Sequence, residues 1–433
     1  MKASKLKIGM MVAAIVALSV GTVSCRKGCT NPTAINYDEK AKKDDGSCLV
    51  DQLEQTELKS GFIASDETWT SDKIYELSGK VVVESGVTLT IEPGTIIKGR
   101  EGTGTLASAL IIARGGKIMA QGTASNPIIF TSVLDEISVG ETVGPNLTET
   151  DQGKWGGVII LGYAPISAGD GDTESQVEGI PPTDAFGAFG GNDPADNSGI
   201  MTYVSIRHGG ALIGEGNEIN GLTLGGVGNG TTIENIEVVG NVDDGVEFFG
   251  GTVNVSNVIV GFQGDDGIDI DMNYSGTVDN FIVVNGPLSD EALEVDGPEG
   301  STYTTGLFTL SNGTVYTFGG TDANADFKSK AQGTVHNVNF GLARIRASYQ
   351  NDCTDPKEDA YTHLINANPT LSFSGVQFSG MTVYTGSTDD TGMNDCTVPG
   401  IDQTTAEGMM TSGAATGASG NWNWTWMLQK GRL

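Results

Sequence analysis

Positively charged residues are scarce in this sequence, which has 24 Lys and Arg against 54 Asp and Glu and a formal net charge of −30. A chain this acidic is repelled by nucleic acids and by anionic membrane surfaces, and no basic patch offsets the repulsion. Nucleic acid is therefore excluded as a partner. The same charge attracts divalent cations and cationic partners.

Histidine and proline are also rare. The three histidines, His208, His336 and His363, lie far apart in the chain, so neither a His-rich metal site nor a Ser-His-Asp constellation can be argued. Only 13 prolines and no Gly-X-Y period exclude Pro-rich disorder and collagen. Glycine, by contrast, occurs 63 times, which suits a chain that turns every few residues.

No hydrophobic run is long enough for a dedicated membrane span. The apolar stretch 8–20 follows three lysines and is typical of a signal peptide, which we place at residues 1–24. Thr22-Val23-Ser24-Cys25 resembles a lipobox, so we expect Cys25 to be the lipidated first residue of an outer-membrane lipoprotein exposed at the cell surface. Some surface-exported lipoproteins carry acidic residues directly after the lipidated cysteine, but here Arg26, Lys27 and Gly28 follow it. An anchor that faces the periplasm is therefore the alternative.

Five cysteines leave four when Cys25 is set aside, and four cysteines can pair in three ways. The pairing that is local in sequence joins Cys29 to Cys48 and Cys353 to Cys396, as two disulfides in an oxidising compartment. Residues 28–48 also resemble a small disulfide-clipped module that is common in exported proteins of Bacteroidetes. That resemblance implies export and lineage, and no chemistry.

One acidic phrase is written three times, at steps of 22 and 25 residues: 243–248 (DDGVEF), 265–270 (DDGIDI) and 290–295 (DEALEV). Between its copies runs a glycine followed by alternating β-branched residues. Such a period predicts a repeat architecture. From residue 74 onward, short alternating strands are bounded by Gly or Pro, with connections too short for helices, which predicts the coils of a parallel β-solenoid.

The expected fold is all-β: a right-handed, single-stranded parallel β-helix of about twelve coils, at roughly 23 residues per coil. We expect four parts: the signal peptide 1–24; the lipid anchor, clipped module and spacer at 25–72; the β-helix at 73–350; and a disulfide-stapled loop, last coils and aromatic C-terminal cap at 351–433.

Several phrases resemble a family of secreted parallel β-helix proteins of Bacteroidetes and marine bacteria. They are Leu89 to Thr95, Gly115 to Thr131, Trp155 to Gly162 and Tyr203 to Gly210, all in the family's order. The resemblance implies a pectin-lyase-like superhelix and no established activity.

Two long acidic stretches, 134–154 and 165–199, interrupt the coils, and we expect them to project as loops from one side of the solenoid. Near the C-terminus, Trp422, Trp424 and Trp426 alternate as in a strand with one aromatic face. A cap over the last coil is favoured over a carbohydrate-stacking platform, because a solenoid must cover its open end.

Alternation within the acidic phrase turns Glu247, Asp269 and Glu294 outward, one rung apart. A second acidic column is expected at the adjacent corner. Calcium, which prefers many oxygen ligands, would compensate this charge; raised pKa values, solvation or plain turn chemistry are the alternatives. The candidate ligands of a structural Ca²⁺ are Asp243, Asp244, Glu247, Asp265, Asp266, Asp269, Asp271, Asp290, Glu291 and Glu294.

The function that the sequence favours is a non-catalytic, adhesin-like envelope rod that binds a glycan or a protein partner. One alternative is a carbohydrate-active enzyme, a polysaccharide lyase or glycoside hydrolase, with catalytic acids among Asp243, Asp244, Asp265, Asp266 and Asp269. Another is an accessory subunit of an outer-membrane uptake complex. Fold analogy alone cannot decide among them.

Overall fold

The structure is a computed structural model that describes residues 26–48 except 33, 55–214, 218–317, 323–341, 344–349, 358–385, 403–409, 411–412 and 414–433. It contains two units, divided between Glu54 and Gln55, and each is described by itself. Cys25, Cys353 and Cys396 lie outside the described residues, as does the signal peptide. No helix among the described residues is both long and apolar enough to cross a membrane.

The first unit is a short loop closed by a disulfide. Cys29 and Cys48 are bonded, with their Cα atoms 4.6 Å apart, as the sequence-local pairing predicted. The Asp44 and Asp45 carboxylates accept hydrogen bonds from the N–H groups of Gly46 and Ser47, both at 3.0 Å. The Asp-Asp-Gly of this module is therefore turn chemistry.

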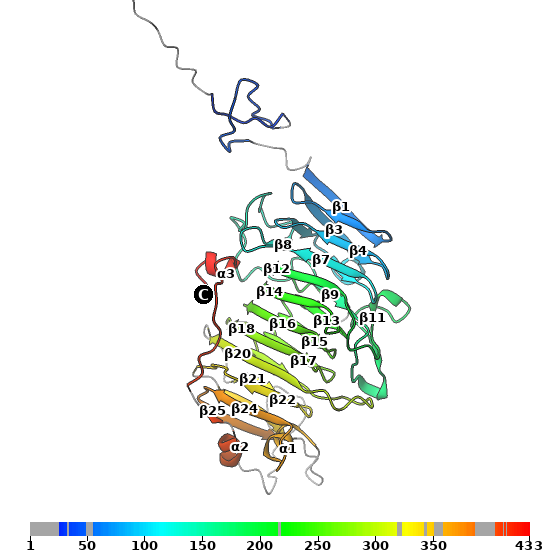
Figure 1. The fold of residues 1–433 in the computed structure, drawn as a ribbon, viewed down its shortest axis with the longest axis vertical. Coiled ribbons are helices and arrows are strands. Elements are labelled where there is room, and N and C mark those ends of the chain that lie inside the picture. The colour runs from blue at the N-terminus through cyan, green and yellow to red at the C-terminus, as the bar shows by residue number, and fades with distance from the viewer. Residues whose placement is uncertain are drawn as a thin grey trace, which may run out of the picture. The chain divides into compact units, whose positions relative to one another are not determined.

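The second unit is a right-handed parallel β-helix, whose strands stack coil on coil along three faces that we call A, B and C. Several strands bend at a corner and belong to two faces. Figure 1 shows the stacked strands. Face A is formed by the second halves of β1 (Thr56–Ile63) and β3 (Ile74–Val83), then β6 (Ala109–Ile112), β9 (Val158–Leu161), β13 (Leu222–Gly225), β15 (Val246–Phe249), β17 (Ile268–Asp271), β19 (Leu293–Val295), β21 (Ala323–Phe327), β23 (Arg344–Tyr349) and β25 (Gly380–Thr385).

Face B follows face A in each coil. It contains β2 (Glu67–Trp69), β4 (Thr88–Ile91), β7 (Lys117–Gln121), the first parts of β12 (Gly199–Arg207), β14 (Thr232–Val239), β16 (Asn254–Gly261), β18 (Thr277–Asn285) and β20 (Phe308–Thr317), then β22 (Gly333–His336), β24 (Leu371–Val376) and β26 (Thr411–Ser412). Face C contains the first halves of β1 and β3, then β5 (Ile96–Gly99), β8 (Ile128–Ser132) and the second parts of β12, β14, β16, β18 and β20.

A single left-handed residue makes the corner between faces B and C in several coils. These residues are asparagines with φ between 54° and 56°: Asn235, Asn257, Asn280, Asn312 and Asn337. Their side chains stack between coils, since the Asn280 amide donates to the Asn257 oxygen at 2.6 Å. Asparagine tolerates this conformation better than most other side chains, so these residues have a structural role at the corner.

The β-helix begins at β1, within the stretch expected to be a spacer. β1 resembles a spacer because only Ile63 of its eight residues is buried. Among the described residues, eleven strands stack in face A between β1 and β25, rather than about twelve over 73–350. The two long insertions occupy chain length that regular coils would otherwise use.

The insertions fold back onto the β-helix rather than projecting from one side of it. Residues 134–154 lie on face C, where Ile137 packs with outward-facing Ile74, Ile96 and Ile129. Residues 165–199 lie on face A and cover outward-facing apolar residues such as Ile159. This insertion contains the hairpin of β10 (Glu174–Gln176) and β11 (Ala188–Gly190). The apolar side chains that point outward from faces A and C must be shielded from water, which explains why the insertions lie on these faces instead of projecting.

The C-terminal segment, residues 414–433, also differs from expectation. It is not a strand and does not cap the last coil: it runs back along the coils to α3 (Trp426–Gln429) (Figure 1). Trp422 and Trp426 pack on the outside of face C, against Val239, Ile259 and Ile282. Because all three tryptophans of this segment are buried, they form no platform for sugars.

The remaining helices are short. α1 (Ala360–Ile365) and α2 (Gln403–Met409) lie beside the last strands of face A, and single 3₁₀ turns occur at Gly104–Leu106, Gly169–Gly171 and Ala185–Gly187.

Candidate cation-binding site

The acidic ladder forms on the outside of face A, as the repeat predicted. Glu247 of β15 pairs with Asp269 of β17, and Asp269 pairs with Glu294 of β19. The flanking residues Val246, Phe248, Ile268 and Ile270 lie in the interior core. The ladder continues to Asp326 and then to Arg346, so it is one rung longer than the repeated phrase.

The corner acids precede these strands and partly serve the backbone. Asp244 accepts a hydrogen bond from the N–H of Asp266 at 3.0 Å, and Asp266 accepts one from Glu291 at 2.8 Å. Glycine is required after the first pair, since a Cβ on Gly245 would stand 2.1 Å from Val260 Cγ1. Hydrogen bonds between successive coils therefore use one carboxyl oxygen of Asp244 and one of Asp266, and leave the second oxygen of each available.

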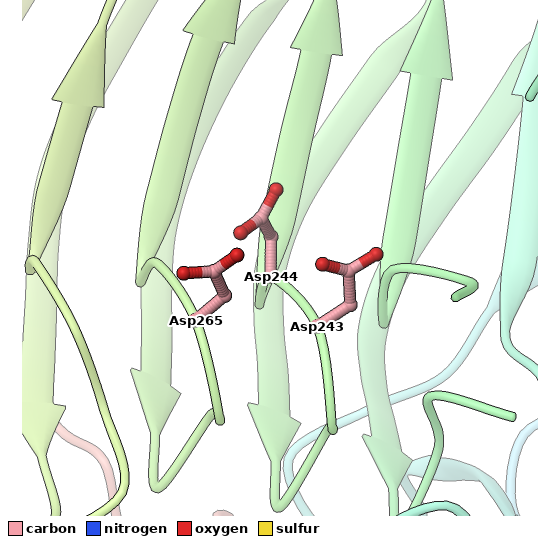
Figure 2. A group of neighbouring side chains, drawn as sticks. All are labelled: Asp243, Asp244 and Asp265. Carbon is pink, nitrogen blue, oxygen red and sulfur yellow. The ribbon is translucent and has the colours of Figure 1, made fainter. Parts of the chain in front are cut away.

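The corner and the ladder meet in a pocket of about 230 Å³. Figure 2 shows the Asp243, Asp244 and Asp265 carboxyl groups on the turns that precede β15 and β17. Glu247, Asp269 and Asp271 extend the floor along face A. Glu178 of the insertion 165–199 and Glu218 of the connection between β12 and β13 lie in the walls. The eight acids in the pocket lining are Glu178, Glu218, Asp243, Asp244, Glu247, Asp265, Asp269 and Asp271.

The two ends of the ladder differ in how their charge is balanced. At the far end, Arg346 lies 2.9 Å from Glu291 and 3.2 Å from Asp326, and Lys328 forms an ion pair with Glu294. At the pocket end, no Lys or Arg of the described residues forms an ion pair with Asp244, Glu247 or Asp269. The pocket end therefore lacks the compensation that the far end contains.

Burial and mutual repulsion raise the pKa values of the pocket acids. Burial, together with the charge of Asp265, raises the pKa of Asp243 to about 7, and burial with Glu299 does the same for Asp271. The pKa values of Asp244, Glu247 and Asp269 lie well above the ordinary range, again chiefly because of burial. Charged acids in this pocket are thus unfavourable without a cation.

The oxygen atoms are spaced as a metal ion requires. Three groups have potential ligand atoms that lie within 4.8 Å of one another: Asp243, Asp244 and Asp265; Asp244, Glu247 and Asp269; and Asp266, Glu291 and Glu294. The third already has cationic neighbours in Lys328 and Arg346. The first two share Asp244 and contain only oxygen donors, which are the ligands of Ca²⁺ and Mg²⁺.

Asn220 adds a second indication of a ligand. Its side chain is 6% exposed and lines the pocket. The amide nitrogen donates to Glu247, while its oxygen, like Oδ1 of Asp269, has no hydrogen-bond partner within the described residues. An unsatisfied buried oxygen is unfavourable. Asp269 belongs to the second group and Asn220 contacts Glu247 of that group, so both unsatisfied oxygens belong to residues at or next to it.

Two of the other predicted ligands belong to none of the three carboxylate groups. Asp271 lines the pocket but belongs to none of the three groups. Asp290 is exposed and, in the described residues, also belongs to none; its N–H donates to the Asp265 carbonyl.

Basic and imidazole groups that a carbohydrate-active enzyme could use are held elsewhere. His208 is buried, with Nδ1 2.9 Å from the Asp151 carbonyl oxygen, and burial lowers its pKa to about 4. Arg207 is buried beside Glu237. No His, Lys or Arg of the described residues lines the pocket.

Sequence reasoning missed Asn220, Glu178 and Glu218 as pocket residues. They come from long connections without a repeat period, so no register placed them at the ladder. Asp326 could have been found, because it lies between Ala325 and Phe327 in the same apolar-acid-apolar pattern as Asp269.

The comparisons with curated proteins and with solved structures find no match. A family model described as the pectate-lyase-like beta helix domain matches residues 61–427, which is most of the chain and nearly all of the second unit. The parallel strands of faces A, B and C are those of a β-helix, in agreement with this match. The chain therefore belongs to the family of pectate-lyase-like β-helix domains.

Proposed function

We propose that this protein is a non-catalytic binding protein of the cell envelope, whose β-helix holds a divalent cation, Ca²⁺ first, in the acid pocket. The cation would stabilise the binding face, where the β-helix takes a glycan or a protein partner. The observation that carries the proposal is the contrast along one ladder: Glu294 forms an ion pair with Lys328, whereas Asp269 has a buried oxygen without a hydrogen-bond partner in the described residues, as does Asn220 of the same pocket.

The proposed location is the outer membrane, to which lipidation of Cys25 would anchor the protein. Surface exposure is favoured, with a periplasm-facing anchor as the alternative. The clipped loop of residues 26–48 is compatible with an oxidising compartment, because it contains the Cys29–Cys48 disulfide. A role as accessory subunit of an uptake complex would require the same anchor and a protein partner.

A carbohydrate-active enzyme is the second candidate, and one observation favours it. The pKa of Asp243 is raised to about 7, so this acid is half protonated near neutral pH, beside the carboxyl groups of Asp244 and Asp265. An acid and a carboxylate on one surface are the minimum for glycoside hydrolysis. The lack of a basic residue in the described pocket lining argues against a lyase.

A glycan array separates these candidates. The soluble protein from Arg26 onward is applied with calcium and with chelator, and acidic polysaccharides are assayed in parallel for reducing ends and unsaturated products. We expect some glycans to bind only when calcium is present, without product, and this calcium-dependent binding is the readout for the acid pocket. Asp269→Asn should abolish it, whereas Glu294→Gln should not, because Glu294 is already paired with Lys328. Product formation that is lost in Asp265→Asn or Asp266→Asn would establish the enzyme instead. If neither binding nor product is detected, a protein partner is favoured over a glycan.

A further inference from the structure

A second cleft lies on face A at the other edge of the insertion 165–199. Its volume is about 680 Å³, within the range of small-ligand sites. Its lining includes three aromatic residues, Phe62 at the end of β1, Tyr163 after β9 and Phe186 in the insertion, and two acids, Glu84 and Asp184. We call these five residues the aromatic cleft.

The aromatic rings are held in place while remaining exposed. Phe62 is 59% exposed, and its ring meets Phe186 edge-on at 5.8 Å between centroids. Tyr163 is 39% exposed, and the Arg114 guanidinium lies 4.9 Å from its ring centroid. Arg114 is fixed by the Gly190 carbonyl oxygen at 2.8 Å. Exposed rings that neighbouring side chains hold in place provide a rigid apolar surface.

The polar groups of the cleft determine which ligands suit it. Within the described residues, neither Glu84 nor Asp184 forms an ion pair, and the cleft's one guanidinium, on Arg114, is already paired with Glu174 at 3.0 Å. Lys80 also interacts with Asp184, but the three acids Glu84, Asp184 and Glu174 outnumber Arg114 and Lys80, so the cleft is net negative and disfavours acidic ligands. Its carboxylates, with the hydroxyls of Ser85 and Thr183, can accept hydrogen bonds from the hydroxyl or amino groups of a ligand.

We propose that the aromatic cleft is a saccharide-binding site for glycans without acidic groups, in which Phe62 and Tyr163 contact the apolar face of the sugar and Glu84 and Asp184 accept its hydroxyl or amino protons. The cleft and the acid pocket share no lining residue, so saccharide binding here requires no cation. It extends the proposed glycan binding, and it can succeed or fail independently of the calcium site.

The test is calorimetric titration of the soluble protein in chelator with hexasaccharides. The probes are cellohexaose, mannohexaose, xylohexaose and the glucosamine hexamer, with hexagalacturonate as the acidic comparison. We expect at least one of the first four to bind. Phe62→Ala and Tyr163→Ala should each weaken its binding about tenfold, the loss of one stacking contact, and Asp184→Asn should also weaken it. Tyr316→Ala is the matched control, because Tyr316 is exposed on β20 and lies outside the cleft lining.

Phe62 and Tyr163 are both exposed and lie outside the interior core, so these variants should fold, which a melting curve verifies. Binding of hexagalacturonate alone, binding unaffected by Phe62→Ala and Tyr163→Ala, or no binding by any probe would each overturn the proposal. Loss of binding in Asp269→Asn with chelator present would also contradict it, since the site would then belong to the acid pocket.

Discussion

Glu247, Asp269 and Glu294 occupy equivalent positions in successive coils, yet their surroundings differ. Two unit charges one rung apart, about 4.8 Å, repel by about 3 kcal/mol at an effective dielectric near 20. Lys328 offsets this repulsion at Glu294. At Asp269, the compensation must be a proton or a bound cation, because no described Lys or Arg reaches it.

The choice between proton and cation predicts a pH dependence. The pKa values of Asp243 and Asp271 are about 7 in the folded chain, above the ordinary value of 3.8. A raised pKa means that the folded state binds the proton more tightly, so stability is greatest at low pH and declines as pH rises from about 4 to about 7. In chelator, the melting temperature should therefore fall between pH 5 and pH 8, as followed by circular dichroism.

Calcium replaces those protons, so its stabilising effect should be small at pH 5 and large at pH 8. The double substitution Asp243→Asn and Asp271→Asn should flatten the pH dependence in chelator. A calcium effect of equal size at both pH values would show that the ion does not compete with these protons.

At the scale of elements, the C-terminal segment stabilises the coils from outside. It forms hydrogen bonds with the asparagines at the corners between faces B and C; the N–H of Ser419, for example, donates to the side-chain oxygen of Asn280 at 2.8 Å. At its end, the Glu237 carboxylate of β14 accepts the N–H groups of Trp426 and Met427, both at 2.9 Å. Glu237 also lies beside buried Arg207, so one carboxylate joins the segment to the β-helix.

Glu237→Gln should destabilise the chain and loosen its C-terminal segment. The change leaves Arg207 as a buried charge without its partner, which costs about 3 kcal/mol. Chemical denaturation measures the stability, and limited proteolysis should cleave the C-terminal segment faster. Glu234→Gln, on the exposed side of the same strand, is the control. Unchanged proteolysis in Glu237→Gln would mean that this carboxylate does not hold the segment.

At the scale of the whole molecule, the repeat predicted the fold and most of the pocket floor. The period places Glu247 beside Asp269 because parallel coils in register align equivalent residues. The family match and the parallel faces confirm the β-helix. Nothing periodic predicted the pocket walls, because Glu178 and Asn220 come from irregular connections whose path depends on tertiary packing.

The position of the C-terminal segment also depends on tertiary packing and could not be predicted from the local sequence. Alternating tryptophans indicated a strand, but Trp426 begins a short helix and is buried against face C. The apolar outward residues Val239, Ile259 and Ile282 determine that position, and local alternation at the tryptophans does not encode it. Likewise, β1 could not be told from a spacer because its pattern is mostly exposed.

The most direct test of the cation site is thermal unfolding of the soluble protein at pH 8, in a calcium titration and in chelator. We expect a saturable rise in melting temperature, with about 2.7 kcal/mol of stabilisation at a calcium concentration a hundredfold above Kd. Glu294→Gln should retain this rise and Asp269→Asn should lose it. Identical melting curves in calcium and in chelator would contradict the account, and the acid pocket would then be balanced by protons alone.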